Sequence, residues 1–596
     1  MSLTPRMIQN FSGESNLEPH WGYASRVVPC KNDAGSCAYL DARQQKQSPF
    51  SRFRHALASR IRTYLLPNAA QFLFGHTTRL QVAILAVLAG YLTIFTFAGI
   101  TYGIWITPIA NQPPDVKNTR SSLSPWSDRI GVLAYALTPL SVLLASRESL
   151  LSLITGIPYT SFLFLHHWTG YIILIQSMLH TIGWLIIEAR LYRPQPTVWD
   201  TFMASEYAVW GFVALGLLVL LWVLSLGWTV RNDTGYEFFR KAHYVLAMLY
   251  IGAAIGHWEA LQCFLVPGLV LWGADRLARL VRTWILHYGY ITAEGKWGFR
   301  AAQAEATIWA DEKYGDVVRL EFNHRQQAWK IGQHFFLCFT EGSIWQSHPF
   351  TPLSVPVGDA LGEVKHSYIL RAKGGETKKV AEIIRKKMAD VEGKEGKPTT
   401  SVILQGPYGE SIVEGMAPDS NVLCVAGGTG IAYVLPVLLT IVRGKAVPGM
   451  RIELVWAVKR ARDVEWVAPE VEELRRLGLA HGIKIRVFVT DDEVVTSGVV
   501  SGEKGEDKQT VIRSSSSASS SSASGDGQST RPDVESVVSQ FVAEVAQGST
   551  RVYGSGPPGM IGDLRAAVAK SNSGSKVWKG EERFDVGLFC DDRLEW

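Results

Sequence analysis

Residues 80–106 read LQVAILAVLAGYLTIFTFAGITYGIWI and contain no charged side chain in 27 positions. A helix needs about 20 apolar residues to cross the roughly 30 Å hydrocarbon core of a bilayer. This stretch therefore predicts a transmembrane helix. Five further apolar segments predict the remaining spans of a six-helix membrane bundle: 130–146, 160–187, 207–227, 242–260 and 262–281. We therefore expect the protein to lie in a lipid bilayer.

The composition of the chain excludes several other classes. At about 150 residues per domain, 596 residues predict three or four structural units. The net charge is only +5, and no basic run is interleaved with aromatic residues, so we expect no nucleic-acid partner. The six cysteines are scattered and form no Cys-x-x-Cys pair, which argues against a disulfide framework and against a zinc site.

The basic residues that flank the spans predict the orientation in the membrane. Twelve Lys and Arg residues fall on one side and five on the other, and the richer side is expected to face the cytosol. Residues 1–60 contain no apolar core of a signal peptide. We therefore expect residues 1–78 to form a cytosolic, partly disordered N-terminal region, and the C-terminal half to be cytosolic as well.

The third and fifth spans each carry two histidines with the same spacing. His166 and His180 are 14 residues apart, and so are His243 and His257. Fourteen residues are 40° short of four full helical turns and give a rise of about 21 Å, so each pair lies on one helix face near opposite membrane edges. Both spans run from inside to outside, which predicts that His166 faces His243 and that His180 faces His257.

Two stacked haems, each held by two histidines, would account for this arrangement, because imidazole is a common axial ligand of haem iron. A single histidine in a membrane helix more often only bonds a neighbouring helix. Two equal pairs on parallel spans favour ligation, and ionisable residues at membrane depth are functional candidates by default. We interpret the adjacent His167 as a supporting residue rather than a ligand.

The pattern changes after Trp284. Short alternating strands such as 315–322 and 366–372 predict a small antiparallel β-barrel. From Asn421 onward, strands and helices alternate: strand 421–428, helix 429–443, strand 451–458, helix 469–477 and strand 483–490. This βαβ rhythm is typical of a nucleotide-binding sheet. Between about 496 and 533 lies a serine-rich stretch, which we expect to be a disordered insertion.

A glycine-rich turn, Gly427-Gly428-Thr429-Gly430, connects the first of these strands to its helix. Such a turn lets backbone amides approach a phosphate group at the helix N-terminus. It is equally common as a tight connection without a ligand, so alone it leaves both interpretations open.

Together these residues resemble the ferric reductase branch of the superfamily that also contains the NADPH oxidases, over residues 80–596 apart from the insertion. The resemblance implies an FAD-binding site in two parts, followed by a turn into the NADPH domain. Its first part is the strand His348-Pro349-Phe350-Thr351. A phosphate-binding segment contains Arg371, Gly374, Gly375 and Thr377, with Glu376 where an aromatic is more usual. A turn, Gly406-Pro407-Tyr408-Gly409, leads into the next domain.

The same resemblance implies an NADPH site. Its dinucleotide loop runs from Gly427 through Gly428, Thr429 and Gly430 to Ile431. Lys459 and Arg460 follow the second strand, where cations favour the 2′-phosphate of NADPH, although an ordinary solvated surface pair is an equal alternative. Ser555-Gly556-Pro557 resembles the start of the family's nicotinamide loop, with Ser555 in the place of a cysteine. The resemblance gives Ser555 and the terminal Trp596, which would cover the flavin, catalytic roles.

The function implied is a metalloreductase. Electrons from cytosolic NADPH would pass through FAD and two b-type haems to ferric or cupric chelates, in support of metal uptake at the plasma or the vacuolar membrane. Two alternatives remain open at this stage: an NADPH oxidase that reduces dioxygen, and a haem-binding protein with an impaired reductase half. The expected domains are 1–78, a transmembrane haem domain at 79–284, an FAD-binding barrel at 285–410 and an α/β NADPH domain at 411–596.

Overall fold

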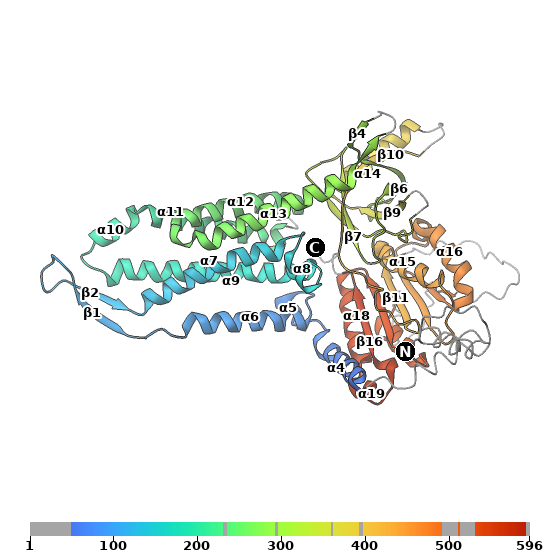
Figure 1. Cartoon of the computed structure of the whole chain (residues 1–596), viewed down its shortest axis with the longest axis horizontal. Helices are drawn as coiled ribbons and strands as arrows, with labels where there is room; N and C mark the ends of the chain where they lie inside the picture. The colour runs from blue at the N-terminus through green and yellow to red at the C-terminus, as the bar shows by residue number, and fades with distance from the viewer. Residues whose placement is uncertain are drawn as a thin grey trace, which may run out of the picture.

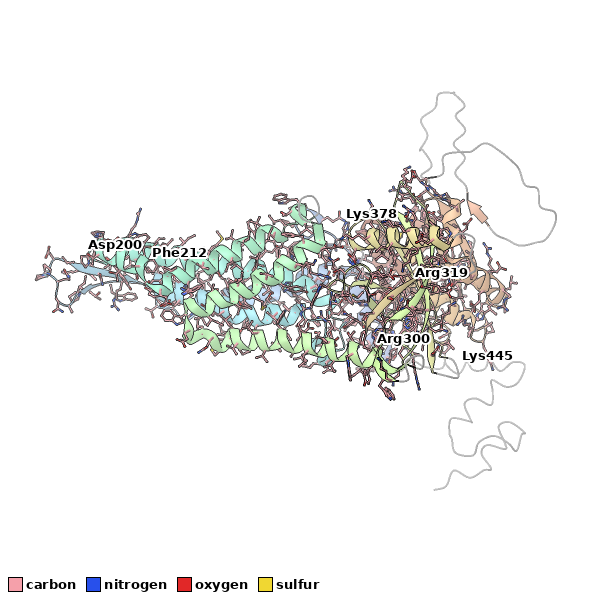
Figure 2. All side chains as sticks on the ribbon, turned by 90° about the horizontal axis from the view of Figure 1, so that it is seen from above. Asp200, Phe212, Arg300, Arg319, Lys378 and Lys445 are labelled. Carbon is pink, nitrogen blue, oxygen red and sulfur yellow. The ribbon has the colours of Figure 1, made fainter. Side chains whose placement is uncertain are left out.

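The computed structural model is elongated, with long helices at one end and two β-containing domains at the other (Figure 1). Asp200 lies toward the far tip of the helical part, whereas Arg319 and Lys445 lie in the opposite part (Figure 2). The described residues are 49–230, 235–291, 296–358, 362–391, 397–491, 510–512 and 531–591.

Four helices are long and apolar enough to cross a membrane, which confirms the membrane region: α6 (Arg79–Phe97), α7 (Leu123–Ala145), α9 (Thr160–Ile186, continued by the π-helical turn Ile187–Leu191) and α11 (Glu206–Ser225). Two more helices, α12 (Gly235–His257) and α13 (Gln262–His287), also reach membrane length but are less apolar. The count of six spans therefore stays a prediction.

The first span is shorter than the apolar run that predicted it. Helix α6 ends at Phe97, and Ile104–Pro108 forms strand β1, which pairs with β2 (Lys117–Ser121) in an antiparallel hairpin. Gly99 has a φ of +75°, which interrupts the helix, and the β-branched residues that follow favour a strand. The expectation of a helix through residue 106 was therefore wrong. Helix α7 differs in the other direction, because it begins seven residues before the predicted position 130.

Helix α7 is at the centre of the bundle. It contacts α6, α9 and α13, while α11 contacts α9 and α12. Buried apolar side chains from four of these helices form the core, including Leu92, Ala134, Ile173 and Leu218. The outer faces are apolar too, as at Val87, which is 74% exposed. An uncovered apolar surface of this extent matches a lipid environment.

The next domain is a six-stranded antiparallel sheet in the order β8-β7-β10-β5-β6-β9. Its end strands β8 and β9 contact each other, so the sheet curls on itself. Strands β6 and β9 confirm the two predicted strands. The bounds are β5 (Ala302–Trp309), β6 (Asp316–Arg325), β7 (His334–Phe339), β8 (His348–Phe350), β9 (Glu363–Ala372) and β10 (Thr399–Tyr408), and helix α14 (Gly375–Val391) follows β9.

The last domain contains a parallel sheet in the order β14-β13-β12-β11-β15-β16. The alternation predicted from Asn421 is confirmed by β11 (Asn421–Gly427), α15 (Ile431–Val442), β12 (Ile452–Val458), α16 (Ala468–Gly478) and β13 (Lys484–Val489). The sheet is completed by β14 (Thr510–Ile512), β15 (Thr550–Ser555) and β16 (Val586–Cys590), with α17 (Val534–Glu544), α18 (Pro558–Ser571) and α19 (Gly574–Trp578) packed around it.

Strand β14 lies inside the predicted disordered insertion of about 496–533, and it pairs in parallel with β13 at the edge of the sheet. The insertion is therefore not wholly unstructured. Its other residues lie outside the described part of the chain, except for 531–533 before α17.

The strand order reverses between β11 and β15. From β11 the chain builds outward through β12 and β13 to β14, and it then returns to place β15 and β16 on the other side. Ligands of open parallel sheets bind at the carboxyl ends of the strands beside such a reversal. This topology predicts a ligand crevice between the ends of β11 and β15.

The shorter elements connect these parts. They are α4 (Pro49–Leu65), α5 (Gln71–Phe74), α8 (Leu150–Thr155), α10 (Thr197–Ala204), β3 (Tyr288–Ile291) and β4 (Lys296–Phe299). Helix α6 begins with a capping box, in which the side chain of Thr78 accepts from the Gln81 amide and the Gln81 side chain accepts from the Thr78 amide.

Candidate functional site

Two pairs of histidine rings face each other between α9 and α12. The ring centroids of His166 and His243 are 6.1 Å apart, and those of His180 and His257 are 6.0 Å apart. The structure thus brings together the residues that the 14-residue spacing paired. Each pair has one ring from each helix, and the two pairs lie at two levels along the bundle.

These separations match the space that one metal ion needs between two imidazoles. Two metal–nitrogen bonds of about 2 Å, plus roughly 1.1 Å from each nitrogen to its ring centroid, give a centroid separation of about 6 Å. The donor set, two imidazoles per level, is the axial set of a six-coordinate haem.

The other ring nitrogen of three histidines is held by backbone. The Nδ1 atoms of His166, His180 and His257 lie 2.9, 2.8 and 2.7 Å from the carbonyl oxygens of Ser141, Ser127 and Tyr207. A carbonyl oxygen only accepts, so each Nδ1 carries the proton and each Nε2 is left free to bind a metal. The buried Nδ1 of His243 has no partner among the described residues.

Two glycines make room for the rings of His180 and His257. A Cβ at Gly131 of α7 would lie 2.7 Å from Nδ1 of His180, and a Cβ at Gly211 of α11 would lie 2.8 Å from Nδ1 of His257. Any other residue at either position would push the ring away. Sequence reasoning missed both glycines, although glycine within an apolar span is often a site of close approach.

His167 takes no part in either pair. Its ring contacts Tyr171 and Trp168 on the same helix, at centroid distances of 4.9 and 6.0 Å. This position is compatible with the supporting role expected for it and provides no second ring for a metal.

The predicted flavin strand β8 lies against the membrane helices. Residues His348, Pro349 and Phe350 pair with β7, and Thr351 follows directly. Arg240 of α12 donates to the carbonyl oxygen of Ser347 at 3.2 Å, and the Nε2 atom of His348 lies 3.8 Å from the Glu237 carboxylate of the same helix. Burial, and then the Arg240 guanidinium, lower the pKa of His348. Helix α12 therefore touches β8 and also carries His243 and His257.

Helix α14 begins at the predicted phosphate-binding segment. Gly375 has a φ of +57°, Thr377 donates its hydroxyl to the Gly374 carbonyl, and the Glu376 amide donates to the Glu237 carboxylate at 2.6 Å. A carboxylate from α12 thus occupies an anion position at the start of α14. The side chain of Glu376 itself is buried.

Arg371 lies at the contact between the two C-terminal domains. Its guanidinium is 3.5 Å from the Asp311 carboxylate and 5.0 Å from the ring centroid of Trp466. The sequence grouped Arg371 with Gly374 and Gly375, whereas in the structure its guanidinium bonds Asp311, Tyr314 and Gly315.

The turn Gly406–Gly409 also rests on the membrane domain. The Tyr408 hydroxyl donates to Glu148 at 2.7 Å, and Arg282 donates to the Pro407 carbonyl and to Glu148. Burial, and then the Glu148 carboxylate, raise the pKa of Tyr408. Gly406 and Gly409 have φ values of +135° and +91°, which explains the glycines.

The two predicted dinucleotide loops meet at the reversal of the strand order. A Cβ at Gly427 would lie 2.7 Å from Pro557 and 3.3 Å from Gly556, and a Cβ at Gly430 would lie 2.3 Å from the Ser555 oxygen. Gly428 has a φ of +56°, while Thr429 and Gly430 complete a 3₁₀ turn before the buried Ile431. Close approach of backbone from both loops forms the base of the crevice that the sheet topology predicts.

The resemblance implies catalytic roles for Ser555 and Trp596, and of these two residues the structure describes Ser555. Ser555 is buried at the end of β15 and is paired with Ala426 of β11. It therefore lies at the carboxyl end of β15, close to Gly430. Trp596 lies outside the described residues, so its expected contact with the flavin stays a prediction.

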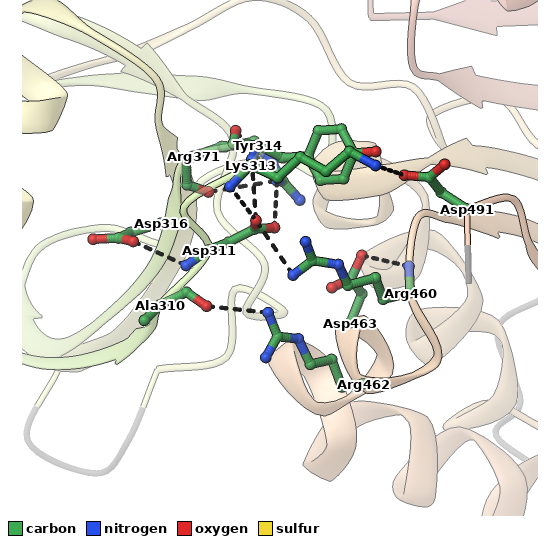
Figure 3. A network of polar contacts seen from close by, with 11 residues as sticks. Ala310, Asp311, Lys313, Tyr314, Asp316, Arg371, Arg460, Arg462, Asp463 and Asp491 are labelled. Carbon is green, nitrogen blue, oxygen red and sulfur yellow. Dashed lines mark hydrogen bonds and ion pairs between the residues drawn. The ribbon is translucent and has the colours of Figure 1, made fainter. Parts of the chain in front are cut away.

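Lys459 and Arg460 belong to a group of cations around one aromatic ring. Their charged groups and that of Lys313 lie 5.1–5.5 Å from the ring centroid of Tyr314. Figure 3 shows that Arg460 also reaches Asp311, at 3.3 Å, while Lys313 pairs with Asp491 at 2.8 Å. Lys459 pairs with no carboxylate in the described part of the chain. These contacts do not decide between the two alternatives, so the 2′-phosphate role of Lys459 and Arg460 stays a prediction.

Three family models match this chain in the order of its domains. The ferric reductase like transmembrane component matches residues 130–254, the FAD-binding domain matches 300–412, and the ferric reductase NAD binding domain matches 419–569. Domain by domain, this chain is similar to the ferric reductase family. Its FAD-binding and NAD-binding domains correspond to the antiparallel and parallel sheets described above.

Curated fungal relatives of the ferric reductase family resemble most of this chain. Ferric reductase transmembrane component 3 of Saccharomyces cerevisiae is 28% identical over 497 residues, and ferric/cupric reductase transmembrane component 2 of the same yeast is 27% identical over 499 residues. Each alignment covers 81% of this chain and 64% of the relative. Ferric/cupric reductase transmembrane component 1 of Candida albicans is 26% identical over 466 residues, which cover 76% of this chain and 55% of the relative.

Proposed function

We propose that this protein is a transmembrane metalloreductase that takes electrons from cytosolic NADPH and delivers them to ferric or cupric chelates on the other side of the membrane. The observation that carries the proposal is the pair of facing histidine pairs on α9 and α12. The family and the names of the fungal relatives support the metal chelate as acceptor.

The histidine pairs fit haem on three independent grounds. The ring separation suits one metal ion, the backbone carbonyls leave Nε2 free, and Gly131 and Gly211 hold space for the rings of the outer pair. His166 and His243 would hold the inner haem, and His180 and His257 the outer one. When bound, FAD would accept the two electrons of a hydride and release them one at a time, and the two haem irons would carry single electrons.

Helix α12 supports a short path between the flavin strand and the inner haem site. Glu237, which reaches His348, is six residues before His243. Six residues of α-helix give a rise of about 9 Å. One rigid element thus sets the distance between the flavin-binding strand and the inner histidine pair, and Arg240 adds a second contact on the same helix.

The chain would bind NADPH in the crevice between β11 and β15. The glycines at 427, 428, 430 and 556 let backbone amides approach the phosphates, and Lys459 offers an ammonium group to the 2′-phosphate. Ser555 at the base of the crevice offers a hydroxyl where relatives have a thiol, which we expect to change the rate of hydride transfer more than the binding of NADPH.

The proposal also covers location and purpose. The family relatives include one named as a cell surface ferric reductase of Aspergillus oryzae. We therefore assign this chain to the plasma membrane, with the vacuolar membrane as the alternative, and assign it to the reduction of iron or copper before uptake.

The decisive experiment is an absorption spectrum of the purified protein under nitrogen. NADPH is added first and a ferric chelate second. We expect reduced low-spin haem bands after NADPH and their loss after the chelate. Reduction by NADPH followed by reoxidation only with dioxygen would instead identify an oxidase. Haem that NADPH never reduces would contradict the reductase proposal and identify a haem-binding protein with an impaired reductase half.

A further inference from the structure

Helix α4 buries its polar face and exposes its apolar face, which is the reverse of a helix in a soluble domain. Five of its six large apolar side chains are exposed: Phe50 by 75%, Phe53 by 54%, Leu57 by 46%, Ile61 by 44% and Tyr64 by 58%. At 100° per residue they fall within an arc of about 80°, so they form one continuous stripe. We call this set the α4 stripe.

The opposite face of α4 is fastened to the NAD-binding domain by polar contacts. His55 and Arg62 reach the Asp585 carboxylate at 2.7 and 2.6 Å, and Ser59 donates to the Phe584 carbonyl at 3.1 Å. Thr63 adds a contact to the Asn572 carbonyl, at 3.4 Å. These residues lie about 180° from the α4 stripe around the helix axis. The stripe therefore points away from the domain that α4 grips.

The charges around the stripe have one sign. Arg54 and Arg60 lie on its two flanks, and neither pairs with a carboxylate in the described part of the chain. The sequence contains no Asp or Glu from residue 42 to residue 114. Arginines beside an apolar stripe can place their stems along it and their guanidinium groups among lipid phosphates. The cytoplasmic leaflet is the anionic surface that such a segment fits.

Helix α4 lies at the foot of a membrane span. Arg79, the first residue of α6, donates to the Tyr64 carbonyl at 3.4 Å, so the C-terminal end of α4 is next to the point where the chain enters the membrane. Between them, α5 exposes Phe72 by 87%. Figure 1 shows α4 beside α19 and just beyond α5 and α6.

We propose that the α4 stripe is a membrane contact that lies in the headgroup region of the cytoplasmic leaflet. Helix α4 then connects the membrane to the NAD-binding domain. Its apolar face binds lipid, and its polar face contacts the NAD-binding domain through Asp585. The bilayer is favoured over a second protein because the stripe continues from a transmembrane helix and is flanked only by cations. This proposal does not depend on the redox function.

Photo-crosslinking of the full chain in lipid vesicles tests the proposal. The analogue p-benzoylphenylalanine is placed at Phe53, on the stripe, or at His55, on the docked face, and the protein is reconstituted into phosphatidylcholine–phosphatidylserine vesicles. After illumination we expect about tenfold more lipid adduct at position 53 than at position 55. Position 55 should instead link to the segment 572–585. Both changes leave the Arg62–Asp585 pair in place, and Phe53 is 54% exposed.

Three results would overturn the proposal. A link from position 53 to residues 1–48 would show that the chain covers its own stripe. A link to the same segment of another copy would show a dimer contact. Absence of any adduct at position 53 would show a stripe exposed to water. A separate comparison in phosphatidylcholine alone tests the arginines, for which we expect a several-fold lower yield, and an unchanged yield would contradict their role.

Discussion

At the scale of single residues, the proposed outer haem site needs two glycines, Gly131 and Gly211, as well as its histidines. Replacement Gly211→Ala would place a methyl group 2.8 Å from the His257 ring. Since real contacts of this kind are longer, the ring must move and the outer site must distort. We expect about half of the bound haem to be lost, measured as low-spin haem absorbance per protein.

A matched control is available on the same helix. A Cβ at Gly216 of α11 would meet nothing within 4 Å. Replacement Gly216→Ala should leave the haem content unchanged and should slightly stabilise the helix. Equal haem loss in the two variants would show that the contact between Gly211 and His257 is not the cause.

Lys459, the cation next to Tyr314 that pairs with no carboxylate among the described residues, is expected to select NADPH over NADH. Replacement Lys459→Ala removes a charge-assisted contact to the 2′-phosphate, so the KM for NADPH should rise about tenfold while the KM for NADH stays constant. Steady-state kinetics with both nucleotides measures this. The control is Arg462→Ala, because Arg462 lies three residues further along and, among the described residues, bonds only the Ala310 carbonyl, at 3.3 Å. A similar rise in both KM values would contradict the role of Lys459.

Much of this residue-level arrangement could be predicted from the sequence, but not all of it. Helical geometry alone predicted which histidine faces which, since a 14-residue spacing fixes both face and height. The partners of the Nδ1 atoms could not be predicted, because the carbonyls of Ser127, Ser141 and Tyr207 come from neighbouring helices. The role of Arg371 was also hidden, because it depends on how two domains pack.

At the scale of elements, the antiparallel domain contains a cluster of three histidines: His287, His324 and His366. The rings of His287 and His324 are 4.9 Å apart, and those of His324 and His366 are 6.3 Å apart. Burial, and then the neighbouring His287, lower the pKa of His324 to about 4. Burial likewise lowers the pKa of His366 well below its usual value. The folded cluster is therefore neutral.

This cluster should make the domain sensitive to acid. The folded His324 stays neutral where the unfolded residue, with a pKa near 6.5, binds a proton, so stability is present above about pH 6.5 and falls toward pH 4 by about 3 kcal/mol. The variant His324→Leu should lose less thermal stability than the unchanged protein when the pH falls from about 7.5 to about 5. Unfolding followed by tryptophan fluorescence measures this, and parallel losses in both proteins would contradict it.

Strand β14 divides the serine-rich insertion into parts with different expected importance. Deletion of residues 514–530 spares β14, so NADPH-driven haem reduction should stay within about twofold of the unchanged rate. Deletion of 501–530 also removes the edge strand that pairs with β13, and the NAD-binding domain should then become easier to digest with protease. Equal protease sensitivity after both deletions would show that β14 contributes nothing.

The elements differ in how well the sequence predicted them. Strands and helices from Asn421 to Val489 follow the predicted order because fully apolar strands alternate there with clear turns. The run from residue 80 to 106 predicted one helix, since composition does not distinguish an apolar helix from a helix followed by the start of an apolar strand. The glycine at 99 marks the boundary, but its conformation is visible only in the structure.

At the scale of the whole molecule, several polar contacts join the membrane bundle to the C-terminal domains. Arg147 and Arg240 reach Ser347, Glu237 reaches the start of α14, and Glu148 holds Tyr408. The sequence predicted the membrane domain and the two domains that follow it, but none of these contacts, because all of them join residues at least 100 positions apart. These contacts set the distance between the membrane bundle and the antiparallel domain.

The two histidine levels have an electrical consequence. They are about 21 Å apart in a hydrocarbon core of about 30 Å, so an electron that passes between them crosses roughly two thirds of the membrane voltage. An interior-negative potential would assist this transfer by about 1.5 kcal/mol per 100 mV. Turnover is then electrogenic. In sealed vesicles it should slow as charge accumulates and recover when potassium and valinomycin dissipate the voltage, whereas a rate indifferent to valinomycin would contradict this. A cell that uses such a protein must return one positive charge outward, or one negative charge inward, for every metal ion it reduces.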